Sequence, residues 1–170
     1  MDNNVKTDIS EDQRFKGICG LIHNFAVAFK IGILILLVVL FLINLTDTLS
    51  VIYMSDIFKA AFILYYSAVF FIVAGYVEQI FGRLRKAETP FTYDIAHKMK
   101  GLGYILAVGG IVGGDIFVLF HLFIDGLSDE WFGFPLIISF VLMVVGLIFT
   151  AFALIFEHGC KLQQESDETL

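Results

Sequence analysis

The apolar run Ile31–Ile43, with the sequence IGILILLVVLFLI, decides how this chain folds. It is the densest part of a longer segment, Leu21–Leu45. A helix needs about 20 mostly apolar residues to cross the hydrocarbon core of a bilayer, and this segment is long enough. A spanning strand would show alternation over about ten residues, whereas this run is apolar on every face. The run therefore predicts a transmembrane helix.

Three further segments, 60–77, 101–124 and 131–156, have the same character. Of the 170 residues, 58% are hydrophobic and 16% are charged, whereas soluble domains carry about 25% charged residues. We therefore predict an all-α integral membrane four-helix bundle. Residues 1–20 form a polar N-terminal segment, 21–157 the four-span domain with a connecting loop at 82–101, and 158–170 an acidic tail.

Basic residues are distributed unevenly between the two sides of these spans. One side holds Lys6, Arg14, Lys16, Lys30, Arg83, Arg85, Lys86, Lys98, Lys100 and Lys161, and the other holds Lys59. Lysine and arginine gather on the cytoplasmic side of membrane proteins. We therefore predict up-down topology with the N-terminus, the 82–101 loop and the tail in the cytoplasm. The outer loops are too short to form a binding domain.

Asp115 is the acidic residue inside the third span. Placing a carboxylate at mid-membrane costs at least ~2.5 kcal/mol, and such groups often mark function. One interpretation is a proton or cation site. Two others are a shifted span that brings Asp115 nearer the outer interface, and a structural hydrogen bond to Ser67, Ser139 or Tyr66.

Two other groups in the spans are candidates for packing or chemistry. Gly109 with Gly113, and Gly110 with Gly114, have the spacing that lets helix backbones approach closely. This spacing favours packing within the bundle, with a homodimer contact or space for a ligand as alternatives.

The second group is charged. Lys30, Glu78 and Glu157 lie near the inner ends of their spans. They form either a charge cluster lining a cytoplasmic vestibule or structural pairs that reach the headgroups.

The sequence gives little support for catalysis. It contains no nucleophile elbow, phosphate loop or zinc-protease motif, so we predict no enzyme, no catalytic residues and no cofactor. Cys19, His23, His158 and Cys160 would offer four soft ligands, but their spacing matches no standard zinc motif, and we predict no metal site. Nothing basic enough for direct nucleic-acid binding appears.

Two motifs resemble a known family. Glu88-Thr89-Pro90-Phe91-Thr92, followed by Lys98 and Gly103, is similar to the central loop of the bacterial membrane family described as domain of unknown function 2975. The runs 155–159 and 162–170 resemble the end of its last span and its acidic tail. The resemblance covers nearly the whole chain. It implies a multi-pass protein of the bacterial cytoplasmic membrane, without assigned enzymatic activity, that partners a small helix-turn-helix regulator.

Two functions follow as expectations. The first is a regulatory or sensory membrane protein that holds a cytoplasmic helix-turn-helix transcription regulator. Its docking residues would be Pro90, Phe91, Thr92, Leu162, Gln163, Glu165, Asp167 and Glu168. The alternative is a small transporter or channel component that uses Asp115; four spans are few for a transporter, so this function needs a homo-oligomer. Membrane lipid is an expected partner in both cases, and a structural accessory subunit is a third interpretation.

Overall fold

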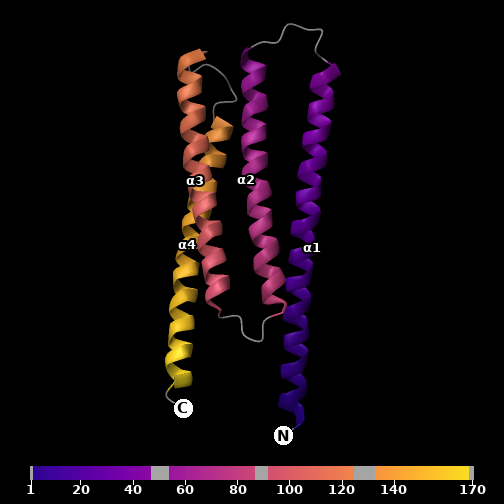
Figure 1. Ribbon diagram of the computed structural model, residues 1–170, viewed down its shortest axis with the longest axis vertical. Helices are drawn as coiled ribbons and strands as arrows, with labels where there is room; N and C mark the ends of the chain where they lie inside the picture. The colour runs from indigo at the N-terminus through magenta and orange to yellow at the C-terminus, as the bar shows by residue number, and fades with distance from the viewer. Residues whose placement is uncertain (1, 47–53, 87–91, 125–132, 169–170) are drawn as a thin grey trace.

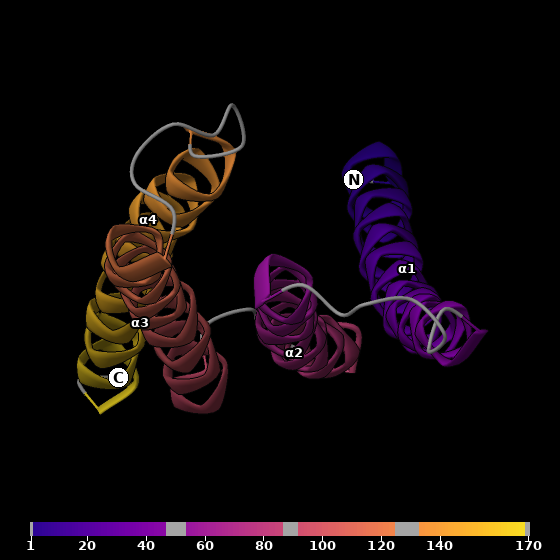
Figure 2. The ribbon, with the colours of Figure 1, turned by 90° about the horizontal axis from the view of Figure 1, so that it is seen from above.

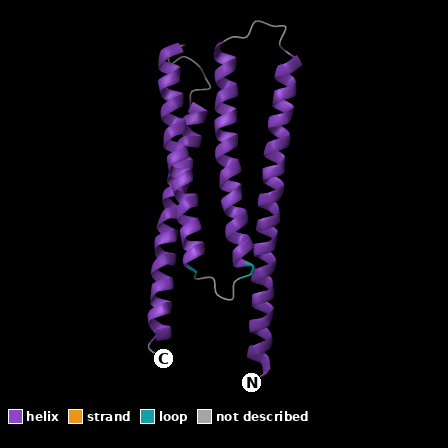
Figure 3. Ribbon diagram, in the orientation of Figure 1, coloured by secondary structure: helices purple, strands orange, loops and turns teal. Residues whose placement is uncertain are grey.

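The protein is described by a computed structural model that covers residues 2–46, 54–86, 92–124 and 133–168, which are almost entirely helical (Figure 3). The helices are α1 (Asp2–Thr46), α2 (Met54–Leu84), α3 (Tyr93–Ile124) and α4 (Gly133–Glu168). Each contains a window long and apolar enough to cross a membrane: Gln13–Val39, Ala60–Leu84, Tyr93–Leu119 and Pro135–Ser166. The prediction of an all-α protein with four membrane-spanning helices is confirmed at this level.

The helices extend beyond the predicted spans. At 1.5 Å per residue, α1 is about 68 Å long and α4 about 54 Å, both longer than the ~30 Å hydrocarbon core. α3 begins at Tyr93, and the carbonyl of the preceding Thr92 accepts a hydrogen bond from the Ala96 N–H at 3.1 Å. Thr92 therefore occupies the N-cap position of α3. Because α2 ends at Leu84, the connection between α2 and α3 is shorter than the predicted 82–101 loop.

The four helices lie in an open row. α1 packs on α2, α2 on α3, and α3 on α4, and Figure 2 shows α1 and α4 at opposite sides of the row. In a closed four-helix bundle the first and last helices would also be neighbours. Here α1 and α4 each have one main neighbour among the described residues. Figure 1 shows both chain ends at one end of the molecule, which we call the N/C end.

Cys19, Ala26 and Ile33 are buried on α1. The hydrophobic core cluster belongs to α2, α3 and α4. It consists of Tyr66, Ile80, Ile95, Leu102, Leu106 and Leu142. In the most apolar window of α3, 44% of the residues are buried, against 11% in that of α1. The apolar surface of α1 is therefore turned outward, where lipid would cover it, and α1 is attached to the other helices along one narrow face.

Candidate functional site

A polar cluster, which we call the α1–α2 cluster, joins α1 to α2 within their membrane-spanning segments. The Lys30 ammonium lies 2.9 Å from a carboxylate oxygen of Glu78 and 5.2 Å from the centre of the Phe71 ring. His23 Nδ1 lies 2.9 Å from the backbone carbonyl oxygen of the same Glu78. The side chains of Lys30 and Glu78 are 27% and 29% exposed, so the pair is largely shielded.

The spacing of residues on α1 explains this placement. Cys19, Ala26 and Ile33 recur every seven residues and are buried, so they mark the face that packs on α2. His23 lies four residues after Cys19, and Lys30 four after Ala26, which puts both on the same face. A carboxylate in lipid is costly unless it is paired. Glu78 meets this requirement by pairing with Lys30.

The contacts define what this cluster can do chemically. A carbonyl oxygen only accepts hydrogen bonds, so His23 Nδ1 carries the hydrogen and donates it to Glu78. An imidazole and an ammonium of α1 therefore both contact Glu78 of α2, and together they tie α1 to α2.

A second polar group connects α2, α3 and α4 near the middle of the row. Ser139 Oγ donates its single hydrogen to the Pro135 carbonyl at 2.9 Å. Tyr66 is therefore the donor in the 2.5 Å bond to Ser139 Oγ. The neighbouring Tyr65 donates to the Gly109 carbonyl at 2.9 Å. Both tyrosines satisfy their hydroxyl groups inside the protein, as buried polar groups must.

The four predicted packing glycines face two different helices. A Cβ on Gly109 would lie 3.1 Å from the Val69 side chain, and one on Gly113 would lie 2.5 Å from the Tyr66 hydroxyl, both on α2. A Cβ on Gly110 would lie 2.5 Å from the carbonyl oxygen of Ser139 on α4. Gly114 also faces Ser139. Gly109 and Gly113 therefore contact α2, and Gly110 and Gly114 contact α4.

Sequence reasoning missed two further glycines at the α3–α4 interface. A Cβ on Gly103 would lie 2.7 Å from the backbone nitrogen of Thr150, and one on Gly146 would lie 2.7 Å from the carbonyl oxygen of Gly103. The signal was present in the seven-residue interval between Gly103 and Gly110, with Ala107 between them. Together these small residues bring the α3 and α4 backbones into direct contact.

Asp115 is exposed on the surface of α3 rather than enclosed between helices. Of its three predicted partners, Tyr66 and Ser139 bond to each other instead. At 1.5 Å per residue it lies about 22 Å along the helix from Lys100. The exposure shows that Asp115 is not enclosed between the described helices, and its position near the outer interface stays a prediction.

The predicted cluster of Lys30, Glu78 and Glu157 does not form. Lys30 pairs with Glu78 between α1 and α2, whereas Glu157 on α4 lies 3.7 Å from Lys100 on α3. The reason is the open row, which keeps α1 and α4 apart (Figure 2).

The separation of α1 from α4 also divides the four soft ligands. Cys19 and His23 belong to α1, and His158 and Cys160 belong to α4. No group of three or more potential metal ligands occurs among the described residues.

The predicted docking residues fall into two groups. Thr92 is half-buried at the start of α3, while Pro90 and Phe91 lie outside the described residues. Among the predicted docking residues of the tail, the side chains of Leu162, Gln163, Glu165 and Glu168 are exposed, and that of Asp167 lies outside the described residues. The tail residues His158, Lys161, Gln164 and Ser166 are exposed as well. The tail is helical through Glu168. It is therefore the terminal part of α4 rather than an extended strand.

Comparisons with protein families, curated proteins and solved structures found no match. The resemblance to domain of unknown function 2975 stays a prediction that rests on its motifs.

Proposed function

We propose that this chain spans a bacterial cytoplasmic membrane in up-down order with both chain ends in the cytoplasm. The support is the distribution of charge. The described basic residues toward the N/C end include Arg14, Lys16, Arg83, Arg85, Lys86, Lys98, Lys100 and Lys161. Basic residues near the ends of spans favour the cytoplasmic side. The N/C end in Figure 1 would then face the cytoplasm.

Within this topology the protein acts as a regulatory membrane protein that docks a basic cytoplasmic partner on the end of α4. The observation that carries this proposal is the exposed acidic end of that helix. Glu165 and Glu168 are exposed, and the last turn of α4 contains no basic residue. The carbonyl groups at a helix C-terminus already carry partial negative charge, so acidic side chains there are unfavourable. A basic partner would relieve this repulsion.

The class of partner comes from the resemblance, which implies a small helix-turn-helix regulator. Such a protein has a basic surface for its DNA, and that surface is complementary to the acidic end of α4. Binding there would compete with DNA for the same positive charge. Thr92 and the adjacent Pro90-Phe91 segment form the second part of the proposed docking site.

A crosslinking pulldown from native membranes tests this proposal. The full chain is compared with a chain truncated before Gln163, and with a full-length variant carrying Glu165→Gln, Asp167→Asn and Glu168→Gln. The full chain should capture a DNA-binding protein, and both altered chains should lose it. Glu157→Gln, which removes one negative charge elsewhere on α4, is the control and should retain the partner. Equal capture by all four chains would overturn the proposal.

A further inference from the structure

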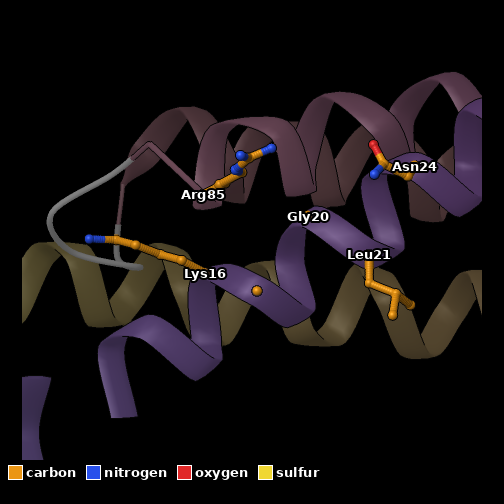
Figure 4. A pocket seen from close by; sticks show the side chains of 6 residues that line it. Lys16, Gly20, Leu21, Asn24 and Arg85 are labelled. Carbon is orange, nitrogen blue, oxygen red and sulfur yellow. The ribbon is translucent and has the colours of Figure 1, made fainter. Parts of the chain in front are cut away.

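A groove lies between α1 and the end of α2, near the N/C end. Figure 4 shows its lining residues. They are Lys16, Gly17, Gly20, Leu21 and Asn24 from α1, and Arg85, which follows α2. The groove has a volume of about 530 Å³ and is open to its surroundings. The Lys30–Glu78 pair and the proposed docking tail involve other residues, so this groove is a separate feature.

Two glycines create the hollow. A Cβ on Gly17 would meet no atom within 4 Å, and one on Gly20 would meet the Arg85 side chain at 3.7 Å. The Arg85 side chain therefore lies across the bare backbone of Gly20. Figure 4 shows Arg85 extending over Gly20 on the side of Asn24, while Lys16 extends the other way along the groove. Any larger residue at position 17 would fill the space.

The polar lining is suited to an anion. Lys16 and Arg85 carry positive charge, Asn24 offers amide donors, and none of the six lining residues is acidic. Arg83, close by in the sequence, pairs through its guanidinium with Asp94 on α3. Arginine binds phosphate through two parallel N–H···O bonds, which gives both strength and geometry. The groove thus offers donors from α1 and from the turn after α2 to one phosphate group.

The apolar surroundings indicate that the phosphate belongs to a lipid. Leu21 lines the groove and is 69% exposed. On the same helix, Phe15, Ile18 and Phe25 are also exposed. The groove lies near the start of the Gln13–Val39 span, where headgroups meet the hydrocarbon core. A ligand held here by its phosphate would have its acyl chains beside this apolar surface.

We propose that the groove binds the phosphate headgroup of an anionic glycerophospholipid. Arg85 and Asn24 contact the phosphate above Gly20. Basic pockets between membrane helices on the cytoplasmic side bind anionic headgroups by the same physics. The bound lipid would bridge α1 and the residue that follows α2.

Lipid binding to the purified full-length protein in detergent tests this site. Phosphatidylglycerol and phosphatidylcholine are titrated separately, and bound lipid is counted by native mass spectrometry. Inorganic phosphate is added as a competitor to distinguish a lipid site from a free-phosphate site. Arg85→Gln removes the guanidinium, and Gly17→Leu fills the hollow without a clash. The matched controls are Lys86→Gln, which removes an adjacent charge, and Gly32→Leu, since a Cβ at Gly32 also meets nothing within 4 Å.

The site predicts tighter binding of phosphatidylglycerol than of phosphatidylcholine. Charged hydrogen bonds contribute about 1.5–3 kcal/mol, so Arg85→Gln should weaken phosphatidylglycerol binding about tenfold or more. Gly17→Leu should do the same, and both controls should bind within about twofold of the unaltered protein. Equal binding of the two lipids, or equal affinity of the Arg85→Gln variant, would overturn the proposal. Full competition by millimolar inorganic phosphate would overturn the assignment to lipid.

Discussion

The α3–α4 and α1–α2 interfaces join neighbouring helices by different means. At α3–α4, Gly103, Gly110 and Gly146 leave no room for a Cβ, so backbone meets backbone. At α1–α2, the main specific contacts are long side chains, with Lys30 and His23 both reaching Glu78. A glycine contact has one geometry, whereas side-chain pairs can open or exchange partners.

The difference indicates which part of the molecule is rigid. α2, α3 and α4 share the buried core and form one unit, and the proposed docking end of α4 belongs to it. α1 is attached along one face, which buries Cys19, Ala26 and Ile33 against α2 and adds the polar contacts of Lys30 and His23 to Glu78. We infer that α1 is the helix that responds to the membrane, and that α4 presents a fixed surface.

The largest expected effect comes from closing the gap between α3 and α4. In Gly146→Leu, the new Cβ would lie 2.7 Å from the Gly103 carbonyl oxygen and 2.9 Å from the Ala107 Cα. Both are backbone atoms that cannot rotate away, so the helices must separate, at a cost of about 3 kcal/mol or more. Thermal unfolding in detergent should show a strongly lowered midpoint or no folded protein. Gly32→Leu is the control. A Gly146→Leu variant with the same unfolding midpoint as Gly32→Leu would contradict the tight contact between α3 and α4.

An intermediate effect is expected at the α1–α2 cluster. Glu78→Leu leaves the Lys30 ammonium without its carboxylate in a shielded position, which should destabilise the protein by about 1.5–3 kcal/mol. Replacing both partners, as Lys30→Met with Glu78→Leu, removes the unpaired charge and should restore most of the lost stability. The same thermal unfolding measurement compares the two variants. If the double variant is no more stable than the single one, the pair does not act as a coupled tie.

The smallest expected effect concerns the two native cysteines. Cys19 is buried on α1 and Cys160 on α4, at 1% and 5% exposure, so static burial alone predicts slightly slower labelling of Cys19. If α1 opens more readily than α4, Cys19 should instead react several-fold faster, because a buried thiol reacts only during local opening. Labelling rates with a small neutral thiol reagent are measured in the Cys160→Ala and Cys19→Ala variants. Equal or faster labelling of Cys160 would contradict the mobility of α1.

Hydropathy was sufficient to predict the four helices but not their full lengths. Runs such as Ile31–Ile43 leave only a helix as a solution in lipid, because every backbone polar group must be satisfied within the segment. The polar parts of α1 before Leu21 and of α4 after Glu157 carry no such constraint. Their continuation as helix depends on extending an existing helix, which is easier than starting one.

Lys30 and Glu78 were predictable as site residues, but their pairing was not. Lys30 and Glu78 stood out because charges within spans are costly. Their contact depends on the register between α1 and α2, which single-sequence patterns do not contain. Glu157 was grouped with them because a closed bundle was assumed, and the open row gives it Lys100 instead. His23 and Arg85 were missed as site residues because their roles arise from contacts with the neighbouring helix.

Site-specific photocrosslinking in living cells tests the docking surface most directly. A photoreactive residue replaces Gln164 on the end of α4 or, as a matched control, Gln13 on α1; both side chains are exposed toward the N/C end. We predict that position 164 traps a basic DNA-binding protein, identified by mass spectrometry, and that position 13 does not. The adduct should disappear when Glu165, Asp167 and Glu168 are neutralised. An adduct that survives neutralisation, or the absence of any adduct specific to position 164, would contradict docking on α4.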